Sequence, residues 1–283
     1  MRFAIANNNR VEANPGLKAF CPGCSQPVVA KCGNKRIHHW AHYSQKICDH
    51  WWESETEWHR KWKDNFPIEW QEIFLADEQL GKKHIADVQT PEGLVIEFQH
   101  SNIIHQERTI RENFYKQMIW VVDGTRLKKD FPRFVRAKNH LRKGYKPNIF
   151  YVECPEKCFP SAWAQSPVPI IFDFFDSTSS PEEYAIRQPL YYLLPIQIGS
   201  CKIIAEIPRK EFIETIRNGE WSTHIQNFSY ELDQVKLQQH ENRRRNKERY
   251  SLITGHAQNT IPLANDKLNL SSSTELNNDV DLH

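Results

Sequence analysis

Residues 87–99, DVQTPEGLVIEFQ, predict a β-hairpin whose strand register is set by its turn. Two runs of strand-forming residues flank a short loop at 91–93, which contains Pro and Gly. If Gly93 takes the left-handed conformation that glycine adopts without strain, this three-residue loop brings Thr90 opposite Leu94. The pairing of the residues farther along both strands follows from that closing pair.

The predicted hairpin carries acidic side chains where a half-buried strand normally carries apolar ones. In this register Asp87 lies opposite Glu97, and Gln99 follows Glu97 on the same face because side chains alternate along a strand. Opposed residues have Cβ atoms roughly 5 Å apart, so two carboxylates there destabilise the fold unless a cation lies between them. We therefore predict a Mg²⁺ or Mn²⁺ site at Asp87 and Glu97. The alternative is that both acids are exposed charges on an antiparallel strand.

A helix predicted over residues 51–66 supplies a candidate for a third acid. Its sequence, WWESETEWHRKWKDNF, stops at Pro67, which cannot continue a helix. Glu53, Glu57 and Lys61 follow at intervals of four residues and therefore share one helical face. Of the acids on that face, Glu57 is the best candidate to complete a metal site.

A second helix, predicted over residues 101–118, follows the hairpin and carries a basic stripe. Arg108, Arg111 and Tyr115 lie three and four residues apart, which places them on one face. Arginine binds phosphate through bidentate, charge-assisted hydrogen bonds, so this stripe predicts a contact with a nucleic-acid backbone. An ordinary solvated helix face is the alternative interpretation.

The segments CPGC at 21–24 and HHWAH at 38–42 predict a zinc ribbon. A Cys-x-x-Cys turn presents two thiolates to one tetrahedral ion, and two imidazoles complete the set, so the predicted ligands of a structural Zn²⁺ are Cys21, Cys24, His39 and His42. Such a small segment has little apolar core, so metal binding would supply its folding energy. Three other residues remain open as replacements for one of the histidines: His38, Cys32 and Cys48.

Composition limits the class of protein. The formal net charge of the 283 residues is only +2, so any nucleic-acid surface must be local. Seven cysteines, an odd number crowded near the N-terminus, favour a reducing compartment and a metal site over a disulfide scaffold. We find neither a signal peptide nor an apolar run long enough to cross a membrane, which predicts a soluble, cytoplasmic protein.

The order of predicted elements is helix, strands, helix, strand, which indicates an α/β fold. Strand-like segments such as VPIIFDFF and KIIAEI either extend the same sheet or form a second lobe. We predict four regions along the chain: a zinc-ribbon-like module at 1–50, a core at 51–150, an α/β extension of unknown role at 151–230, and a polar helix with a disordered tail at 231–283.

Five of these segments together resemble a known family. CPGC…HHWAH, ETEWHRKWK, HIADV, VIEFQHS and RENFYKQMIWVVDG are similar to the competence protein CoiA-like family, over residues 17–125. The nuclease core of that family resembles the PD-(D/E)xK restriction-endonuclease-like fold, a mixed sheet flanked by helices. The resemblance implies that Glu57 is the helical acid, Asp87 the central metal ligand and Glu97 the second ligand. Gln99 stands where the fold usually has lysine.

The resemblance implies a metal-dependent nuclease that cleaves DNA, with a role in DNA uptake, in recombination or in defence against foreign DNA. The expected cofactors are Mg²⁺ or Mn²⁺ at the acidic site and Zn²⁺ at the ribbon, and the expected partners are DNA and recombination or defence proteins. Gln99 can orient water, but it has no positive charge to offset the negative charge that grows on the phosphate. The rival expectation is therefore an inactive DNA- or protein-binding factor that recruits recombination proteins.

Overall fold

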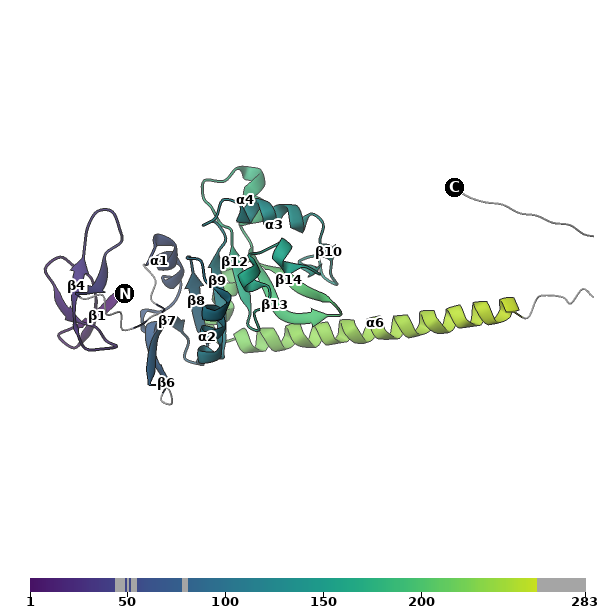
Figure 1. Ribbon diagram of the computed structural model, residues 1–283, viewed down its shortest axis with the longest axis horizontal. Coiled ribbons are helices and arrows are strands. Elements are labelled where there is room, and N and C mark those ends of the chain that lie inside the picture. The colour runs from purple at the N-terminus through teal and green to yellow at the C-terminus, as the bar shows by residue number, and fades with distance from the viewer. Residues whose placement is uncertain (44–48, 50, 52–54, 78–80, 259–283) are drawn as a thin grey trace, which may run out of the picture. The chain divides into compact units, whose positions relative to one another are not determined.

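The computed structural model describes residues 1–43, 49, 51, 55–77 and 81–258, and the chain divides into two units, Met1–Asp233 and Gln234–His283. The first unit contains two β-sheets (Figure 1). The helices of the described chain are α1 (Glu57–Lys63), α2 (His105–Tyr115), α3 (Asp130–Lys138), α4 (Pro181–Arg187), α5 (Arg209–Arg217) and α6 (Trp221–Gln258), with 3₁₀ turns η1 (Ile68–Trp70), η2 (Pro155–Lys157) and η3 (Ser161–Trp163).

Residues 1–43 form an antiparallel sheet with the strand order β2-β1-β3-β4-β5, called here the N-terminal sheet. Its strands are β1 (Phe3–Ala6), β2 (Asn9–Glu12), β3 (Lys18–Phe20), β4 (Pro27–Lys31) and β5 (His39–His42). Asn7 and Asn8 make the two-residue turn between β1 and β2 with positive φ angles of 50° and 62°, which asparagine tolerates. Trp40 is fully buried in this sheet, and its indole N–H donates to the carbonyl of Val11 at 2.9 Å.

A larger mixed sheet follows, with the order β10-β11-β14-β13-β12-β9-β8-β7-β6 among the described residues. Its strands are β6 (Gln71–Asp77), β7 (Lys82–Gln89), β8 (Val95–Gln99), β9 (Met118–Asp123), β10 (Arg142–Lys143), β11 (Ile149–Val152), β12 (Ile170–Asp173), β13 (Leu190–Ile198) and β14 (Cys201–Ile207). Strands β8, β9 and β12 run parallel, and the other neighbours pair antiparallel. The fold is thus mixed α/β with helices flanking the large sheet, as predicted.

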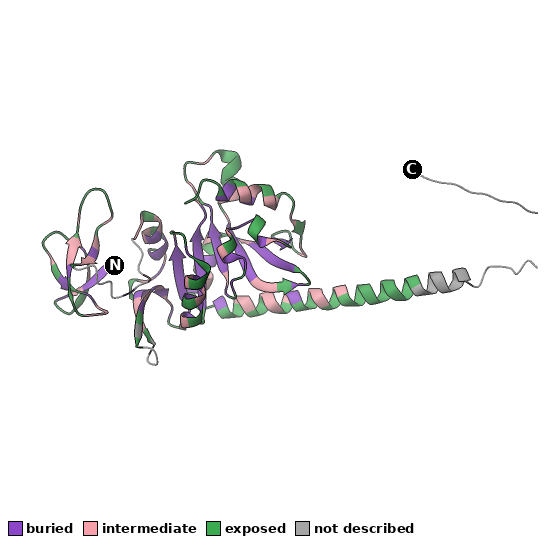
Figure 2. Ribbon diagram, in the orientation of Figure 1, coloured by how far each residue is buried: buried purple, intermediate pink, exposed green. Residues whose placement is uncertain are grey.

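Burial concentrates in the strands at the centre of the large sheet (Figure 2). Every residue of β9, MIWVVD, is buried, because a parallel strand between two neighbours has both faces covered. The predicted boundary between residues 150 and 151 lies within β11, and the strands after it continue the same sheet. The segment after residue 150 therefore contributes β12, the direct neighbour of β9.

Helix α1 is held against the large sheet by one buried carboxylate. The indole N–H groups of Trp58 and Trp62 both donate to Oδ2 of Asp173, at 3.1 and 2.9 Å. The ring of Trp62 also stacks on Phe98 of β8, with centroids 5.7 Å apart. The tryptophans of the ETEWHRKWK segment thus fix the position of the helix relative to β8.

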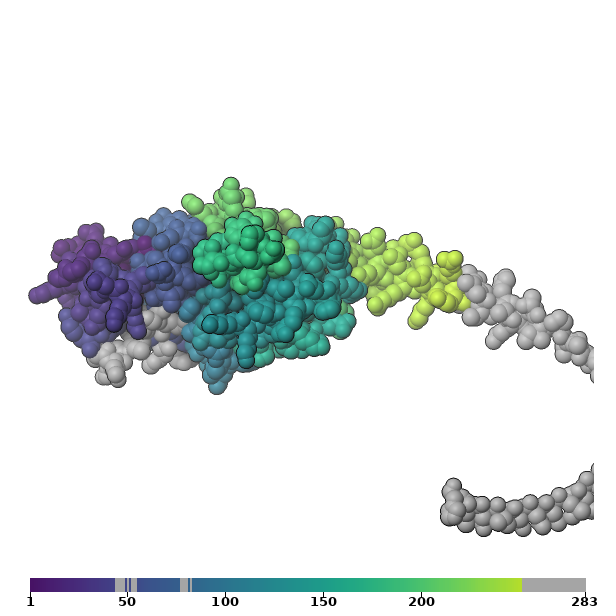
Figure 3. All heavy atoms as spheres, turned by 90° about the horizontal axis from the view of Figure 1, so that it is seen from above, coloured from purple at the N-terminus to yellow at the C-terminus, as the bar shows by residue number. Residues whose placement is uncertain are grey.

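The N-terminal sheet meets the large sheet at β6 and β7. Phe74 and Ile85, from those two strands, pack against its buried core, and the two regions adjoin in the space-filling view (Figure 3). Gly23 is required at this contact, because a Cβ there would lie 2.1 Å from the ring of Phe74.

The predicted C-terminal polar segment is helical in its described part, as the end of α6. Its residues 241–250 are all exposed. The predicted disordered tail falls on residues 259–283, outside the described residues. Within the described chain, no helix combines the length and the apolar character that crossing a bilayer requires.

Candidate functional site

The hairpin of β7 and β8 has the register that the sequence predicts. Val88 pairs with Ile96, and the amide N–H of Thr90 donates to the carbonyl of Leu94 at 2.9 Å. Gly93 has φ = 84°, the left-handed conformation on which the three-residue loop depends. The turn therefore determines which side chains meet farther along the strands.

Asp87 and Glu97 meet directly after the Val88–Ile96 pair. The amide N–H of Asp87 donates to Oε1 of Glu97 at 3.2 Å, and the amide N–H of Phe98 donates to Oδ2 of Asp87 at 3.0 Å. Each carboxylate thus accepts a backbone hydrogen bond from the opposite strand. The two acids lie together between β7 and β8, as the register implies.

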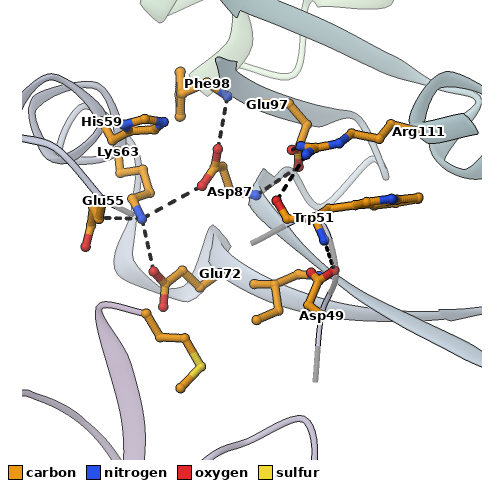
Figure 4. A pocket seen from close by; sticks show the side chains of 12 residues that line it. Asp49, Trp51, Glu55, His59, Lys63, Glu72, Asp87, Glu97, Phe98 and Arg111 are labelled. Carbon is orange, nitrogen blue, oxygen red and sulfur yellow. Dashed lines mark hydrogen bonds and ion pairs between the residues drawn. The ribbon is translucent and has the colours of Figure 1, made fainter. Parts of the chain in front are cut away.

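Both acids line a cavity of about 50 Å³, enough for a few water molecules or a partly hydrated ion (Figure 4). Its walls come from α1, the strands β6 to β8, α2 and the segment before α1. The lining residues are Met1, Asp49, Trp51, Glu55, His59, Lys63, Glu72, Ile85, Asp87, Glu97, Phe98 and Arg111. Five of them are carboxylates, which is an unusual content for so enclosed a space.

Lys63 of α1 points into the carboxylates from one side (Figure 4). Its Nζ lies 2.7 Å from Oε1 of Glu55, 3.0 Å from Oε1 of Glu72 and 3.8 Å from Oδ1 of Asp87. The side chain is 3% exposed, and burial alone would lower its pKa. The carboxylates of Glu72, Glu55 and Asp87 outweigh burial, so the pKa of Lys63 lies above its ordinary value and the ammonium stays charged.

Glu55 and Glu72 have further partners of their own. Arg60 donates to both oxygens of Glu55, at 3.0 and 2.7 Å. Burial would raise the pKa of Glu55, but Lys63 and Arg60 together lower it to about 2. Glu72 accepts the backbone N–H groups of Arg2, at 2.7 Å, and Phe3, at 3.1 Å. Its own φ of 47° is rare for a residue with a side chain.

Asp87 and Glu97 are less well compensated. Burial raises the pKa of Asp87, although the nearby charges of Lys63 and His59 oppose that rise. Burial and the neighbouring charge of Asp87 raise the pKa of Glu97 well above its ordinary value. The nearest cation to Glu97 is Arg111, whose Nη1 lies 3.5 Å from Oε2. Two adjacent carboxylates with raised pKa values form a donor set that fits a hard divalent cation.

The remaining acid of the cavity wall, Asp49, has a local partner. Its Oδ1 lies 2.8 Å from Nδ1 of His84, and its Oδ2 accepts the amide N–H of Ile85 at 2.8 Å. The ring of His84 stacks on Trp51. Asp49 is therefore held against β7.

Two of the predicted catalytic residues do not line this cavity. Glu57, at the start of α1, is exposed. Gln99 is buried, and its amide nitrogen donates to the carbonyl and the hydroxyl oxygens of Ser101, both at 3.2 Å. Glu55 is the α1-side acid that the structure brings to the cavity.

The sequence reasoning missed Glu55, Lys63 and Glu72. Glu55 and Lys63 lie eight residues apart, which is a helical spacing, but Glu55 precedes the helix by two residues. Glu72 does not stand out in the alternation of side chains along β6, because its positive φ interrupts that alternation.

The predicted phosphate-binding stripe of α2 is buried. Arg108, Arg111 and Tyr115 are 1%, 4% and 8% exposed, whereas Ile110 on the same helix is 46% exposed. Arg108 donates to the carbonyl of Ala162, which fixes its guanidinium inside the protein. The expectation of a solvent-facing stripe thus differs from the structure. The reason is that buried acids on α2 and β8 pair with these arginines.

Three predicted zinc ligands come together in the N-terminal sheet. The ligand atoms of Cys21, Cys24 and His42 lie within 4.8 Å of one another, and Sγ of Cys24 is 3.2 Å from Nε2 of His42. The Cys-x-x-Cys turn closes through a hydrogen bond from the amide N–H of Ser25 to the carbonyl of Cys21 at 2.8 Å. Two thiolates and an imidazole form a donor set that suits Zn²⁺.

His39 is not part of that group in the described chain. Both histidines belong to β5, and residues three apart on a strand point to opposite faces. Nδ1 of His39 instead lies 2.9 Å from the carbonyl of Ile37. Among the alternatives left open, Cys48 lies outside the described residues.

Residues 7–50 match the family model described as Competence protein CoiA, N-terminal domain. The match covers most of the N-terminal sheet and all predicted zinc ligands, so this part of the chain is similar to that domain. No curated protein and no solved structure matches the chain.

Proposed function

We propose that this protein is a metal-dependent nuclease that cleaves phosphodiester bonds of DNA, with Mg²⁺ or Mn²⁺ held by Asp87 and Glu97. One observation carries the proposal. Two carboxylates from adjacent strands meet in a small cavity, and the pKa values of both are raised above the ordinary range. Groups perturbed in this way by burial and by each other are characteristic of functional sites.

The arrangement of elements supports the proposal. Helix α1, strands β6 to β8, helix α2 and strand β9 follow in the order helix, strands, helix, strand that the sequence predicts. Asp87 lies on β7 and Glu97 on β8, the two strands that carry the family's metal ligands. The match of residues 7–50 to the CoiA N-terminal domain supports a role in DNA uptake or recombination, with defence against foreign DNA as the alternative.

Five of the residues that line the cavity have a task in this mechanism. Asp87 and Glu97 would hold the ion, which supplies an activated water and stabilises charge on the phosphate when bound. The backbone N–H groups of Asp87 and Phe98 keep the two carboxylates aimed at each other. Arg111 limits the repulsion at Glu97, and Lys63 limits it at Asp87. Lys63 and Glu97 are largely buried, with side chains 3% and 7% exposed, and the lower local dielectric strengthens their interactions.

The zinc group has a structural task. Cys21, Cys24 and His42 would hold Zn²⁺ and so stabilise the N-terminal sheet. That sheet in turn supplies the amide N–H groups of Arg2 and Phe3 to Glu72, one wall of the acidic cavity. Cys21, Cys24 and His42 would thus support the acidic site from a distance by holding zinc as a structural ion.

The test is cleavage of supercoiled, linear and single-stranded DNA with Mg²⁺ or Mn²⁺, with EDTA as the blank. Asp87→Asn and Glu97→Gln should each lower the rate at least about 100-fold, because several kcal/mol of transition-state stabilisation depend on the ion. Glu57→Gln is the matched control, since Glu57 is an exposed acid outside the cavity. Cleavage that survives both cavity substitutions would refute the proposal.

A second candidate function is binding without cleavage, favoured by Gln99 in the place of lysine. In it, the acidic cavity is a scaffold and the protein binds DNA or recruits recombination proteins. Retarded migration of DNA by folded, zinc-loaded protein, with no cutting of any substrate in either metal, would favour this function.

A further inference from the structure

Lys63 is a cation of the acidic cavity that the family resemblance does not account for. The resemblance places a lysine on β8, two residues after Glu97, where this chain has Gln99. The structure instead brings an ammonium group from α1, on the side of the cavity that Asp87 faces (Figure 4). The positive charge is therefore present, but it comes from a different element.

We infer that Lys63 is a positioning residue whose ammonium group occupies the place of a second cation, so that the acidic cavity takes one divalent ion rather than two. This inference rests on the proposed function, because it assumes that Asp87 and Glu97 hold the first ion. It goes beyond the proposed function in the number of divalent ions that the acidic cavity holds.

The surroundings of Nζ are those of a cation site. Carboxylate oxygens of Glu55, Glu72 and Asp87 lie around it at 2.7, 3.0 and 3.8 Å, from α1's N-terminal side, β6 and β7. Three carboxylates converging on one point also describe the shell of a divalent metal. Here the ammonium fills that point, and its side chain is almost completely buried.

The other partners of these acids already compensate their charges, so a second ion is not needed. Glu55 is held by both donor groups of Arg60, and Glu72 by the backbone N–H groups of two residues of β1 and its start. Asp87 is shared, since Oδ1 faces Lys63 and Oδ2 accepts from the β8 backbone. The cavity volume of about 50 Å³ likewise has room for one ion with a few waters.

A purely structural lysine would give the same contacts, so the test must measure something that structure alone does not change. Lys63→Met removes the charge and leaves three converging carboxylates, which should then bind a second Mn²⁺. Lys63→Arg keeps the charge and should keep the count at one. Lys61→Met is the matched control, because Lys61 is an exposed lysine on the same helix.

The experiment counts Mn²⁺ bound to the zinc-loaded full chain, using the electron paramagnetic resonance signal of free Mn²⁺ in a titration. We expect one ion for the wild type, Lys63→Arg and Lys61→Met, and two for Lys63→Met. Two ions in the wild type, or one in Lys63→Met, would overturn the inference. If Lys63→Met folds only with metal, the titration is made on protein refolded in Mn²⁺. A wild-type count of two would overturn the inference without this variant.

The count separates this inference from the proposed function. Binding of one ion without DNA cleavage would refute the nuclease and leave the inference standing. No bound ion in the wild type would refute both, and that result is distinct from the two-ion result that refutes the inference alone.

Discussion

Replacing the single residue Asp173 is predicted to lower the stability of the fold markedly. It is 2% exposed at the end of β12 and accepts hydrogen bonds from Trp58, Trp62, Arg209 and the amide N–H of Phe175. Replacing it by alanine removes the acceptor shared by α1, α5 and the β12 end. The substitution therefore tests whether α1, which carries Lys63, is held in place by this carboxylate.

The magnitude follows from which donors lose their partner inside the protein. Trp62 is 2% exposed, so its indole N–H is left unpaired at a cost of roughly 1–3 kcal/mol. Trp58 is half-buried and the side chain of Arg209 is 29% exposed, so both regain water in part. We estimate a total loss of about 2–4 kcal/mol, which lowers the unfolding midpoint by roughly 5–15 °C for a unit of this size.

The assay is thermal unfolding followed by calorimetry, with DNA cleavage measured on the same samples at a temperature where the variant is folded. Asp176→Ala is the matched control, because Asp176 is a partly exposed acid three residues away whose side-chain hydrogen bonds lie in its own turn. We expect the midpoint to fall in Asp173→Ala and to stay within about 1–2 °C in the control. An unchanged midpoint in Asp173→Ala would refute the reasoning that this carboxylate anchors α1.

Three further predictions concern the acids, the zinc group and α2. Because the pKa of Glu97 is raised in the folded state, the free energy of unfolding without metal should fall as the pH rises above about 4.5. Unfolding curves recorded from about pH 5 to about pH 8 should show this dependence. Adding Mg²⁺, or replacing Glu97 in Glu97→Gln, should make the free energy of unfolding less dependent on pH. His42→Ala should lower the zinc content, measured with a chromogenic chelator, and destabilise the N-terminal sheet. His39→Ala should retain most of the zinc. Equal losses of zinc in the two variants would contradict the group of three ligands. Arg108→Gln should reduce stability by about 2–3 kcal/mol and leave the salt dependence of DNA binding unchanged, since its guanidinium is buried.

The hairpin shows what sequence can predict well. Its register depends on local rules, a three-residue turn and the alternation of side chains, and these rules fixed the contact between Asp87 and Glu97. The buried strand β9 was predictable for a similar reason, since a continuous apolar run between turns has few alternatives.

The parts that escaped prediction depend on contacts between distant segments. Helical spacing places Arg108 and Arg111 on one face, but it does not say whether that face meets water or buried acids. Their burial became visible only with β8 and η3 in place, where Glu97 and the carbonyl of Ala162 lie. His42 joins the two cysteines and His39 does not, because the segment is a strand on which residues three apart point to opposite faces.

Glu72 illustrates the same limit at the cavity. Its partners are Lys63 and the backbone of Arg2 and Phe3, roughly seventy residues earlier in the chain. No pattern within a short window reports such a contact. Charged residues whose partners come from distant segments are therefore the ones that sequence reasoning passes over.

The strand order of the large sheet also sets the order of events during synthesis. Strand β9 is complete once Asp123 has been made, but its neighbour β12 begins only at Ile170. Until then the edge of β9 that pairs with β12 is open, and α1 lacks the carboxylate of Asp173 to which its tryptophans donate. Asp87 and Glu97 are thus synthesised well before Asp173, the residue that holds α1 beside them. A ribosome-bound or truncated chain that ends before residue 170 carries Asp87 and Glu97 without the carboxylate that fixes α1 beside them.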